Sequence, residues 1–327
     1  DFVKNFTNSL ARLKAPSYST PRPAPRMLAY LRNSFVFSRF TVCLGLFFMA
    51  SGSLWAAGDG GHGDHEALPA FAEEIFRIGP VSITNSMITV WIVAAAIIFV
   101  AQAATREMKL VPSGLQNFVE WLVETLMNFF EGIMGRELAQ RTFWFFGTVF
   151  ILILFSNWFG LIPGVGTVGW ELVGEGRDEH DKFKPFLRGA NADLNLTMAM
   201  ALTFAVLWFY WAFTTIGVKP FFAHIFAPKG DFNGPMLALM VPLFLFVGLI
   251  ECLSIAVRPI ALMFRLYGNV FAGENILEAM QLIVPKGLAW LPPLPFYFLE
   301  LLVGFVQALV FALLCAVFLK LICEEHE

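Results

Sequence analysis

Ionisable side chains interrupt the long apolar stretches in the second half of the chain. Glu251, Arg258 and Arg265 stand seven residues apart, and Glu274 follows nine residues after the last of them. Insertion scales give a cost of at least ~2.5–3.5 kcal/mol for an arginine at the centre of a membrane-spanning helix, so such residues face protein or water. They are therefore candidates for function, and a structural ion pair between helices is the alternative interpretation.

The spacing predicts where these groups lie on a helix. Because a seven-residue step drifts by only ~20° around the axis, the first three share a face. Glu274 is half a turn out of phase with Arg265 and points the other way. Along the axis, Glu251 lies ~21 Å on one side of Arg265, and Glu274 lies ~13 Å on the other. A kink at Pro259 would change these angles more than the axial separations.

A second apolar segment carries Glu300 and Gln307, which also stand seven residues apart and share a face. If the two segments pack as a hairpin, Glu300 approaches Glu274 while Gln307 approaches Arg265. Arginine keeps its proton at any usable pH and can block a proton wire, whereas buried carboxylates can relay protons. A fixed cation between two carboxylate-lined paths predicts two half-channels, which protons cross only if another carrier takes them past the arginine.

The composition indicates a membrane protein. Of 327 residues, 57% are hydrophobic and 14% are charged, whereas a soluble domain carries about a quarter charged residues. The net charge of −3, without a basic patch interleaved with aromatics, argues against a nucleic-acid partner. The four cysteines have no CxxC spacing, which favours free thiols over disulfides or zinc. Because no Gly-rich phosphate loop is present, we expect neither a nucleotide site nor another cofactor.

The apolar runs predict an all-α membrane protein of about five to six helices. The predicted spans are residues 81–105, 143–162, 194–216, 236–284 and 294–323. Residues 115–134 mix apolar positions with Glu120, Glu124 and Glu131, as in a helix that lies at the membrane interface.

The segment 236–284 is about twice the ~20 residues that cross a bilayer perpendicularly. It forms either two spans broken near Pro259 or one steeply tilted helix, which needs protein on one face. With residues 294–323 it would make a long tilted helical hairpin at the C-terminal end.

The first part of the chain predicts a leader and a linker. Residues 1–57 are a leader in which Arg39 precedes an apolar stretch and small residues, as in a secretory signal. An uncleaved further span is the alternative. Residues 58–80 form an acidic linker that contains His62 and His65. These histidines could bind a metal ion, but a solvated loop is the favoured interpretation. Residues 81–327 form a single membrane domain.

The loop charges predict an orientation. Four basic residues lie at one set of helix ends, namely Arg106, Lys109, Lys219 and Lys229, while the loops 58–79 and 164–193 lean acidic. The positive-inside rule places the basic ends, and with them the C-terminus, in the cytoplasm.

The stretch Phe264–Glu274, which reads FRLYGNVFAGE, resembles subunit a of the F-type ATP synthase. That family carries R-L-F-G-N-x-x-A-G-E, and only Tyr267 departs from it. Residues 191–195 (NADLN), residues 304–308 (GFVQA) with Phe311, and residues 324–326 (EEH) resemble further stretches of the family. The resemblance covers about residues 68–327 and leaves the leader outside.

The resemblance implies roles for five of these residues. Arg265 falls on the essential stator arginine, and Gln307 falls on the glutamine that faces it. Glu274 and Glu300 fall on the polar pair of the outer half-channel, where some relatives have histidine in place of Glu300. Glu251 falls on the acidic residue of the inner half-channel.

The resemblance also implies polar wall positions at Asn269 and Asp193. The implied partners are a ring of c subunits, b-type peripheral stalk subunits and the lipid bilayer, with protons as the transported ion. The implied place is a bacterial inner membrane, where this chain is not itself catalytic. A proton would enter from outside, neutralise a ring carboxylate, ride nearly a full circle and leave inward.

An ion-coupled secondary transporter with a structural intramembrane ion pair is the alternative function. It would favour internal repeats, and none of 20–50 residues is evident in the sequence. A membrane-embedded enzyme would need a nucleophile or a metal motif, and the sequence contains no GxSxG or HExxH.

Overall fold

The structure, a computed structural model, describes residues 72, 74–78, 81–106, 108–109, 111–166, 168–172, 182–226, 235–282, 288 and 291–324. These residues form seven α-helices, one 3-10 turn and two short antiparallel hairpins. Five of the helices are long and apolar enough to cross a membrane, which confirms the predicted all-α membrane fold. The predicted leader 1–57, the linker residues 58–71 with His62 and His65, and the C-terminal residues 325–327 lie outside the described residues.

The described chain begins with a hairpin that the sequence did not predict. Strand β1 (Glu74–Ile78) lies in the predicted linker and pairs with β2 (Val81–Thr84). Helix α4 (Asn85–Thr105) then starts four residues later than predicted. The stretch VSIT is rich in β-branched residues, which suit a strand. The Thr84 hydroxyl accepts the Met87 N–H and caps the helix.

Helices α5 and α6 follow one another closely. Helix α5 (Leu115–Met134) has the predicted bounds and is amphipathic, since it buries Phe130 and Met134 but exposes Phe118 and Trp121. Only Gly135 separates it from α6 (Arg136–Gly160), which therefore starts seven residues earlier than the predicted span. Its first turns carry charged residues, and for this reason a search for apolar runs misses them.

The region between α6 and the long hairpin contains short elements. They are β3 (Gly169–Leu172), β4 (Lys182–Pro185), the 3-10 turn η1 (Ala190–Ala192), α7 (Leu194–Thr215) and α8 (Val218–Phe226). The sequence predicted that Lys219 and Pro220 close a span, but they lie in the first turn of α8. A proline is tolerated there because the N–H groups of the first turn have no partner within the helix.

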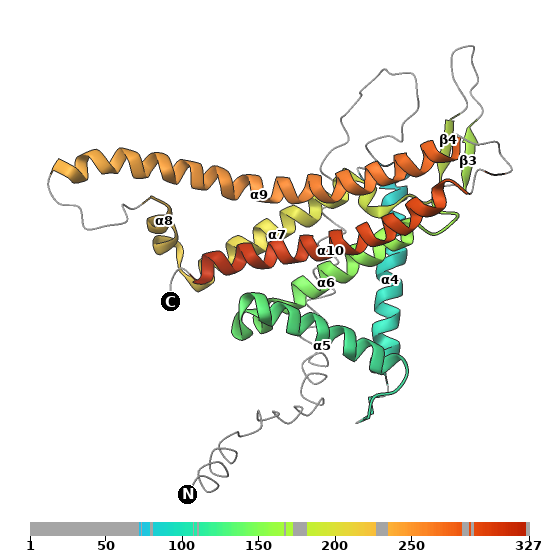
Figure 1. The fold of residues 1–327 in the computed structure, drawn as a ribbon, viewed down its shortest axis with the longest axis horizontal. Coiled ribbons are helices and arrows are strands. Elements are labelled where there is room, and N and C mark those ends of the chain that lie inside the picture. The colour runs from blue at the N-terminus through green and yellow to red at the C-terminus, as the bar shows by residue number, and fades with distance from the viewer. Residues whose placement is uncertain are drawn as a thin grey trace, which may run out of the picture.

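The two longest helices form the C-terminal hairpin. Helix α9 (Pro235–Leu282) is continuous over 48 residues, although Pro242 and Pro259 lie inside it. Of the two alternatives from the sequence, the single helix is therefore correct. Its apolar part covers 40 residues, or ~60 Å, which fits a hydrocarbon core of about 30 Å only when steeply tilted. Helix α10 (Pro293–Glu324) returns antiparallel beside the second half of α9 (Figure 1).

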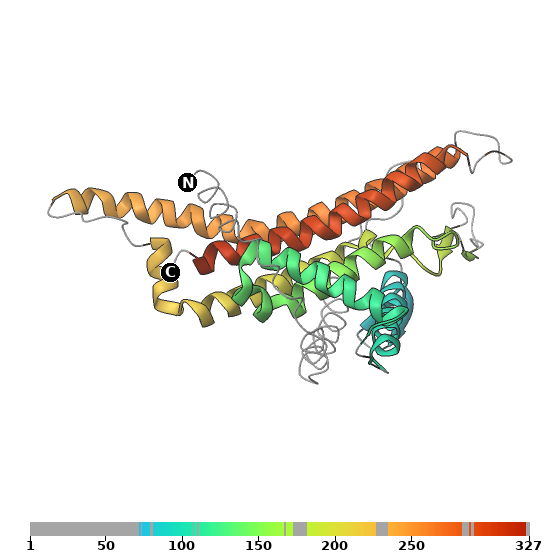
Figure 2. The same cartoon turned by 60° about the horizontal axis from the view of Figure 1, so that its bottom comes forward.

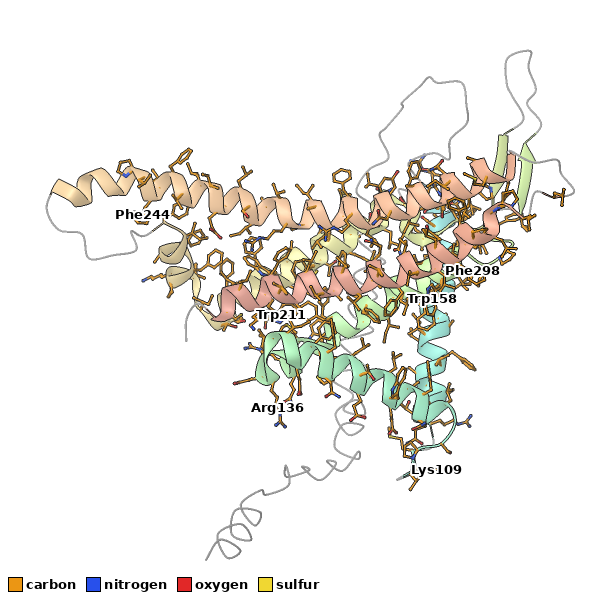
Figure 3. The ribbon with its side chains drawn as sticks, in the orientation of Figure 1. Lys109, Arg136, Trp158, Trp211, Phe244 and Phe298 are labelled. Atoms are coloured by element: carbon orange, nitrogen blue, oxygen red, sulfur yellow. The ribbon has the colours of Figure 1, made fainter. Side chains whose placement is uncertain are left out.

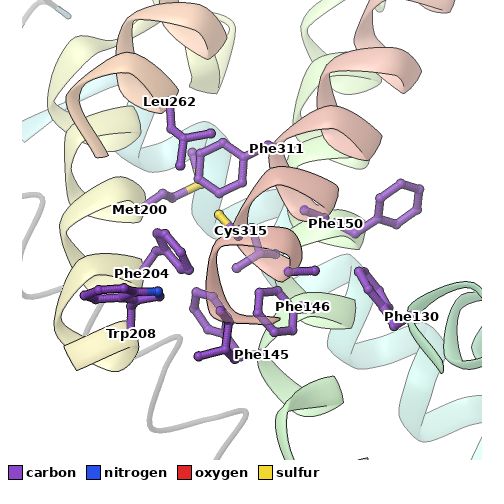
Figure 4. Close-up of a cluster of buried hydrophobic side chains, with 14 of the residues drawn as sticks. Phe130, Phe145, Phe146, Phe150, Met200, Phe204, Trp208, Leu262, Phe311 and Cys315 are labelled. Atoms are coloured by element: carbon purple, nitrogen blue, oxygen red, sulfur yellow. The ribbon is translucent and has the colours of Figure 1, made fainter. Parts of the chain in front are cut away.

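The helices are arranged in layers. Figure 2 shows α9 and α10 as one layer above α5, α6 and α7, while α4 stands across the others (Figures 1 and 2). An aromatic core joins these helices. Figure 4 shows Phe145 and Phe146 of α6, Phe204 and Trp208 of α7, and Phe311 and Cys315 of α10 packed together. Because lipid tails are as apolar as leucine, close van der Waals packing of this kind holds helices together in a membrane.

We predict that Phe146→Ala loosens the helix bundle. The side chain is 1% exposed and contacts the rings of Phe130 and Trp211. Truncating such a phenylalanine costs about 3–5 kcal/mol. Cys315, which is fully buried in the same core, provides the reporter. In a chain whose Cys43, Cys252 and Cys323 are replaced by serine, we expect a thiol dye to label Cys315 at a temperature several degrees lower.

Phe118→Ala is the matched control, since this phenylalanine is 50% exposed on α5. The control variant should label at the same temperature as the parent chain. Equal labelling temperatures for both alanine variants would show that the aromatic core does not hold the bundle.

Candidate functional site

The predicted site residues of α9 keep the axial order expected from the sequence. Because α9 is unbroken, Glu251 lies ~21 Å before Arg265 along the helix, and Glu274 lies ~13 Å after it. Glu251 and Arg265 are exposed, whereas the Glu274 side chain is 20% exposed and turns towards other elements of the protein. Arg265 and Glu274 differ by half a turn in phase, so the arginine is exposed while the glutamate faces other elements of the protein.

Arg265 is exposed at the edge of an apolar side of the hairpin. We call this side the open face and define it by exposed apolar residues: Leu253, Val257, Ile260 and Phe264 of α9, and Phe298, Leu302, Phe305 and Val306 of α10. Consecutive residues of a helix stand ~100° apart around its axis, so Arg265 lies beside the stripe that contains Phe264. Asn269, one turn after Arg265, is exposed with it. Within the described part of the chain, Arg265 has neither a side-chain hydrogen bond nor an ion-pair partner.

Gln307 of α10 is half-buried. No hydrogen bond joins it to Arg265 among the residues that the structure describes. The approach of these two side chains therefore stays a prediction. The two helices that carry them do pack against one another.

Glu274 lies against the segment that precedes η1. Its Oε2 is 3.9 Å from Nε of Arg188, whose side chain is only 4% exposed. Its Oε1 touches Gly189, where a Cβ atom would collide with that oxygen. Two consecutive residues of a distant segment thus contact both oxygens of the carboxylate.

Glu300 of α10 reaches α9 at the level of Glu274. Its carboxyl group lies against Gly273, and a Cβ atom at that position would overlap all three atoms of the carboxyl group. Each of the two carboxylates is therefore seated against a glycine of the opposing element. Glu300 thus contacts the residue before Glu274, and the approach of the two carboxylates to one another stays a prediction.

Asp193 joins the start of α7 to α4. It caps α7 by accepting the Asn195 N–H at 3.0 Å, and it accepts the Ser86 hydroxyl of α4 at 2.5 Å. Burial raises the pKa of Asp193 above its ordinary value, and these two hydrogen bonds and the nearby Arg188 oppose that shift. The buried group is thus a carboxyl held by donors from two helices.

A second set of hydrogen bonds fixes η1. The Asn191 amide donates to Oδ1 of Asn157 at 2.7 Å, and the Asn157 amide donates to the Gly304 carbonyl at 3.0 Å. These bonds tie η1 to α6 and α10. Because η1 stands between Gly189 and Asp193, they also set the position of the groups that face Glu274.

A different arrangement surrounds Glu251. Its Oε1 is 3.9 Å from Nη2 of Arg258, one heptad later on α9. The Arg258 guanidinium lies 4.9 Å from the ring centre of Phe318 and lines a small apolar pocket with Trp208 and Ile255. The ion pair of Arg258 with Glu251 therefore lies within one helix and does not include Arg265.

Sequence reasoning missed Arg188, Ser86, Asn157 and Asn191 as parts of the site. In the sequence Arg188 is one of the charges of the loop 164–193. Sequence periodicity does not show whether a residue outside a helix or strand is buried. The only signal for Arg188 is a cation five residues before Asp193, at the start of a span. Among the described residues, no three His, Cys, Asp or Glu side chains form a group that could hold a metal ion.

Comparison with known proteins finds related proteins over the membrane domain. The family model described as ATP synthase A chain matches residues 87–320. A protein named ATP synthase subunit a, from Gloeobacter violaceus (strain ATCC 29082 / PCC 7421), is 31% identical over 253 residues. That alignment covers 77% of this chain and 89% of the relative. The family match includes Arg188, Asp193 and the site residues of α9 and α10.

We predict that the stability of the protein depends on pH through Asp193. Because burial raises its pKa in the folded state, the folded protein binds this proton more tightly than the unfolded chain does. The resulting stabilisation is present in acid and is lost as the pH rises through the folded pKa. In Asp193→Asn, which keeps an oxygen for Ser86 and Asn195, this loss should disappear.

Thermal unfolding followed by Cys315 labelling at a series of pH values makes the measurement. The Asn variant should gain stability relative to the parent chain as the pH rises. Asp193→Ala is the control, since it removes both the cap and the titrating group and should be less stable than Asp193→Asn by about 0.5–2 kcal/mol at every pH. A difference between Asp and Asn that does not change with pH would contradict the prediction.

Proposed function

The chain belongs to the family of ATP synthase subunit a, a component of the membrane sector of ATP synthase, and from this premise we propose that it forms two offset proton half-channels against a ring of c subunits. Arg265 separates the half-channels. In this proposal the chain conducts protons and performs no catalytic step itself.

The position of Arg265 on the open face carries the proposal. A permanent cation among exposed apolar side chains is unfavourable in a bilayer, at ~2.5–3.5 kcal/mol or more. Arg265 has no ion-pair partner among the described residues, which supports an anion supplied by another molecule. A ring of c subunits that presents a buried carboxylate to this face would supply that anion once per subunit.

The polar groups on either side of Arg265 support the two paths. Towards the end of α9, Glu274 lies against Gly189, and Glu300 lies against Gly273, the residue before Glu274. Asp193 interacts with Arg188, the ion-pair partner of Glu274. Towards its start, Glu251 is exposed. Because the two groups of residues lie ~34 Å apart along the helix, a proton cannot pass directly between them. A ring carboxylate that takes a proton on one side and releases it on the other would complete the route.

The transfer follows from the cost of charge in lipid. A proton that arrives through Glu274 neutralises a ring carboxylate, and the neutral group can then move from Arg265 into the bilayer. After nearly a full turn the carboxyl group comes to the other side of Arg265, which attracts the ionised form and favours release towards Glu251. Each charge that crosses supplies ~2.3 kcal/mol per 100 mV.

The same arrangement supports an orientation. The start of α9 and the end of α10 lie at one end of the molecule (Figure 1). With the C-terminus in the cytoplasm of a bacterial cell, as the positive-inside rule implies, the Glu251 path opens inward. The Glu274 path then opens outward. In the assembled enzyme we expect b-type stalk subunits to hold this chain still against the ring.

The alternative, an ion-coupled secondary transporter with a structural ion pair, gains no specific observation. It would use Arg265 as one partner of an internal pair. Within the described residues, ion pairs instead join Arg188 to Glu274 and Arg258 to Glu251.

We predict that Arg265→Ala abolishes coupled proton transport. Without the cation, ring carboxylates have no group that separates the two paths. ATP-driven proton uptake into inverted membrane vesicles should fall to the background, while the complex remains assembled. Arg136→Ala is the matched control. Arg136 is an exposed arginine at the start of α6, away from α9 (Figure 3), and its loss should leave uptake near the parent level. Full uptake in Arg265→Ala would refute the proposed function.

A further inference from the structure

Arg188 is a second buried cation that the proposed route does not use. It comes from the segment between β4 and η1, outside every helix of the bundle. Arginine stays charged at any usable pH. Because a buried charge is stable only when it is paired, the 4% exposed Arg188 and the Glu274 carboxylate 3.9 Å away form a structural unit.

Arg188 and Gly189 together define the position of the Glu274 carboxylate. Arg188 stands beside Oε2, and the missing side chain of Gly189 makes room for Oε1. The other close neighbour of a Cβ at position 189 would be Ala192, at 3.8 Å, which is ordinary van der Waals contact. Gly189 has φ −49°, which any residue can adopt, so space for the carboxylate is what distinguishes glycine from alanine here.

The charged and titratable groups around Glu274 come from several elements. Arg188 precedes η1, Asp193 caps α7, Tyr267 lies on α9 and Glu300 lies on α10. Helix α4 contributes the neutral Ser86, whose hydroxyl donates to Asp193. Arg265, on the same helix, is ~13 Å away along the axis. Of these groups, Arg188 is the nearest cation.

We propose that Arg188 is a positioning residue of the proton path: its guanidinium holds the Glu274 carboxylate against Gly189 and keeps it ionised between proton transfers. This inference rests on the proposed function. A buried carboxylate without a cation would hold its proton tightly and relay it slowly. A fixed cation lowers that affinity, so Glu274 can accept a proton and then pass it on. The two arginines thus have different roles in the proposal. Arg265 faces the carboxylates of the ring, whereas Arg188 faces Glu274, which relays protons within this chain.

The test uses the whole ATP synthase complex in vesicles, with proton flux measured at a fixed membrane potential. The pH on the side that supplies protons to Glu274 is varied. Flux falls as this pH rises through the pKa of the accepting group. Because a neighbouring cation lowers a carboxyl pKa by about 1–3 units, Arg188→Gln should shift the half-maximal pH upward by about 1 unit or more. Its maximal flux should also fall.

Two further variants separate charge from position. Arg188→Lys keeps the cation, so its half-maximal pH should stay close to that of the parent. Gly189→Ala keeps Arg188 but displaces the carboxylate through the added Cβ. It should therefore shift the half-maximal pH upward by less than Arg188→Gln does, with a normal amount of assembled complex.

An unchanged pH profile in an assembled Arg188→Gln complex would overturn the inference. If that variant does not assemble, the decision rests on Gly189→Ala, whose unchanged profile would show that the cation is only structural. Arg265→Ala, measured alongside, tests the proposed function separately. Retained coupled flux there would remove the premise, whereas lost flux there with an unshifted Arg188→Gln would reject only the role of Arg188.

Discussion

A permanent positive charge on an apolar surface is the constraint on which the rest of the structure depends. Arg265 cannot become neutral, and α9 exposes it at the edge of the open face, beside side chains suited to lipid or to another helix. On the side of α9 opposite Phe264, Leu262 and Leu266 are buried at 2% and 1% exposure. The helix is thereby fixed in rotation, with its arginine outward and Glu274 inward. An outward arginine in a membrane is stabilised by an anion. If that anion moves, as we propose for a ring carboxylate, the pairing can be coupled to proton transport.

The inward side depends on non-helical backbone that is fully covered by protein. Ala190 and Ala192 of η1 are completely buried, and Asn191 is 1% exposed. Irregular backbone at such depth is tolerated when protein surrounds it. The Asn191–Asn157 hydrogen bond and the Asp193 cap provide that support from α6 and α7. Arg188 and Gly189 are placed against Glu274 as a consequence.

Much of this arrangement could be predicted from the sequence, because apolar runs report helices and charges within them report positions along an axis. The hairpin and the opposite phases of Arg265 and Glu274 followed from spacing, whereas the continuity of the long helix was one of two alternatives that the sequence left open. The short strands and α8 could not be predicted in the same way, since each is too brief to establish a period. Arg188 was missed because only tertiary packing shows that this loop residue is buried. The approach of Gln307 to Arg265 depends on how two helices rotate against each other, which spacing does not determine.

The most direct test of the central claim is disulfide cross-linking between the open face and the ring. The chain would carry a single cysteine, with all native cysteines replaced, and the ring a cysteine beside its carboxylate. Phe264→Cys, at a side chain that is 55% exposed beside Arg265, should cross-link under oxidation, and Leu262→Cys, at a side chain 2% exposed, should not. Cross-linking at position 262 with none at 264 would contradict the account, because the ring would then meet the other side of α9.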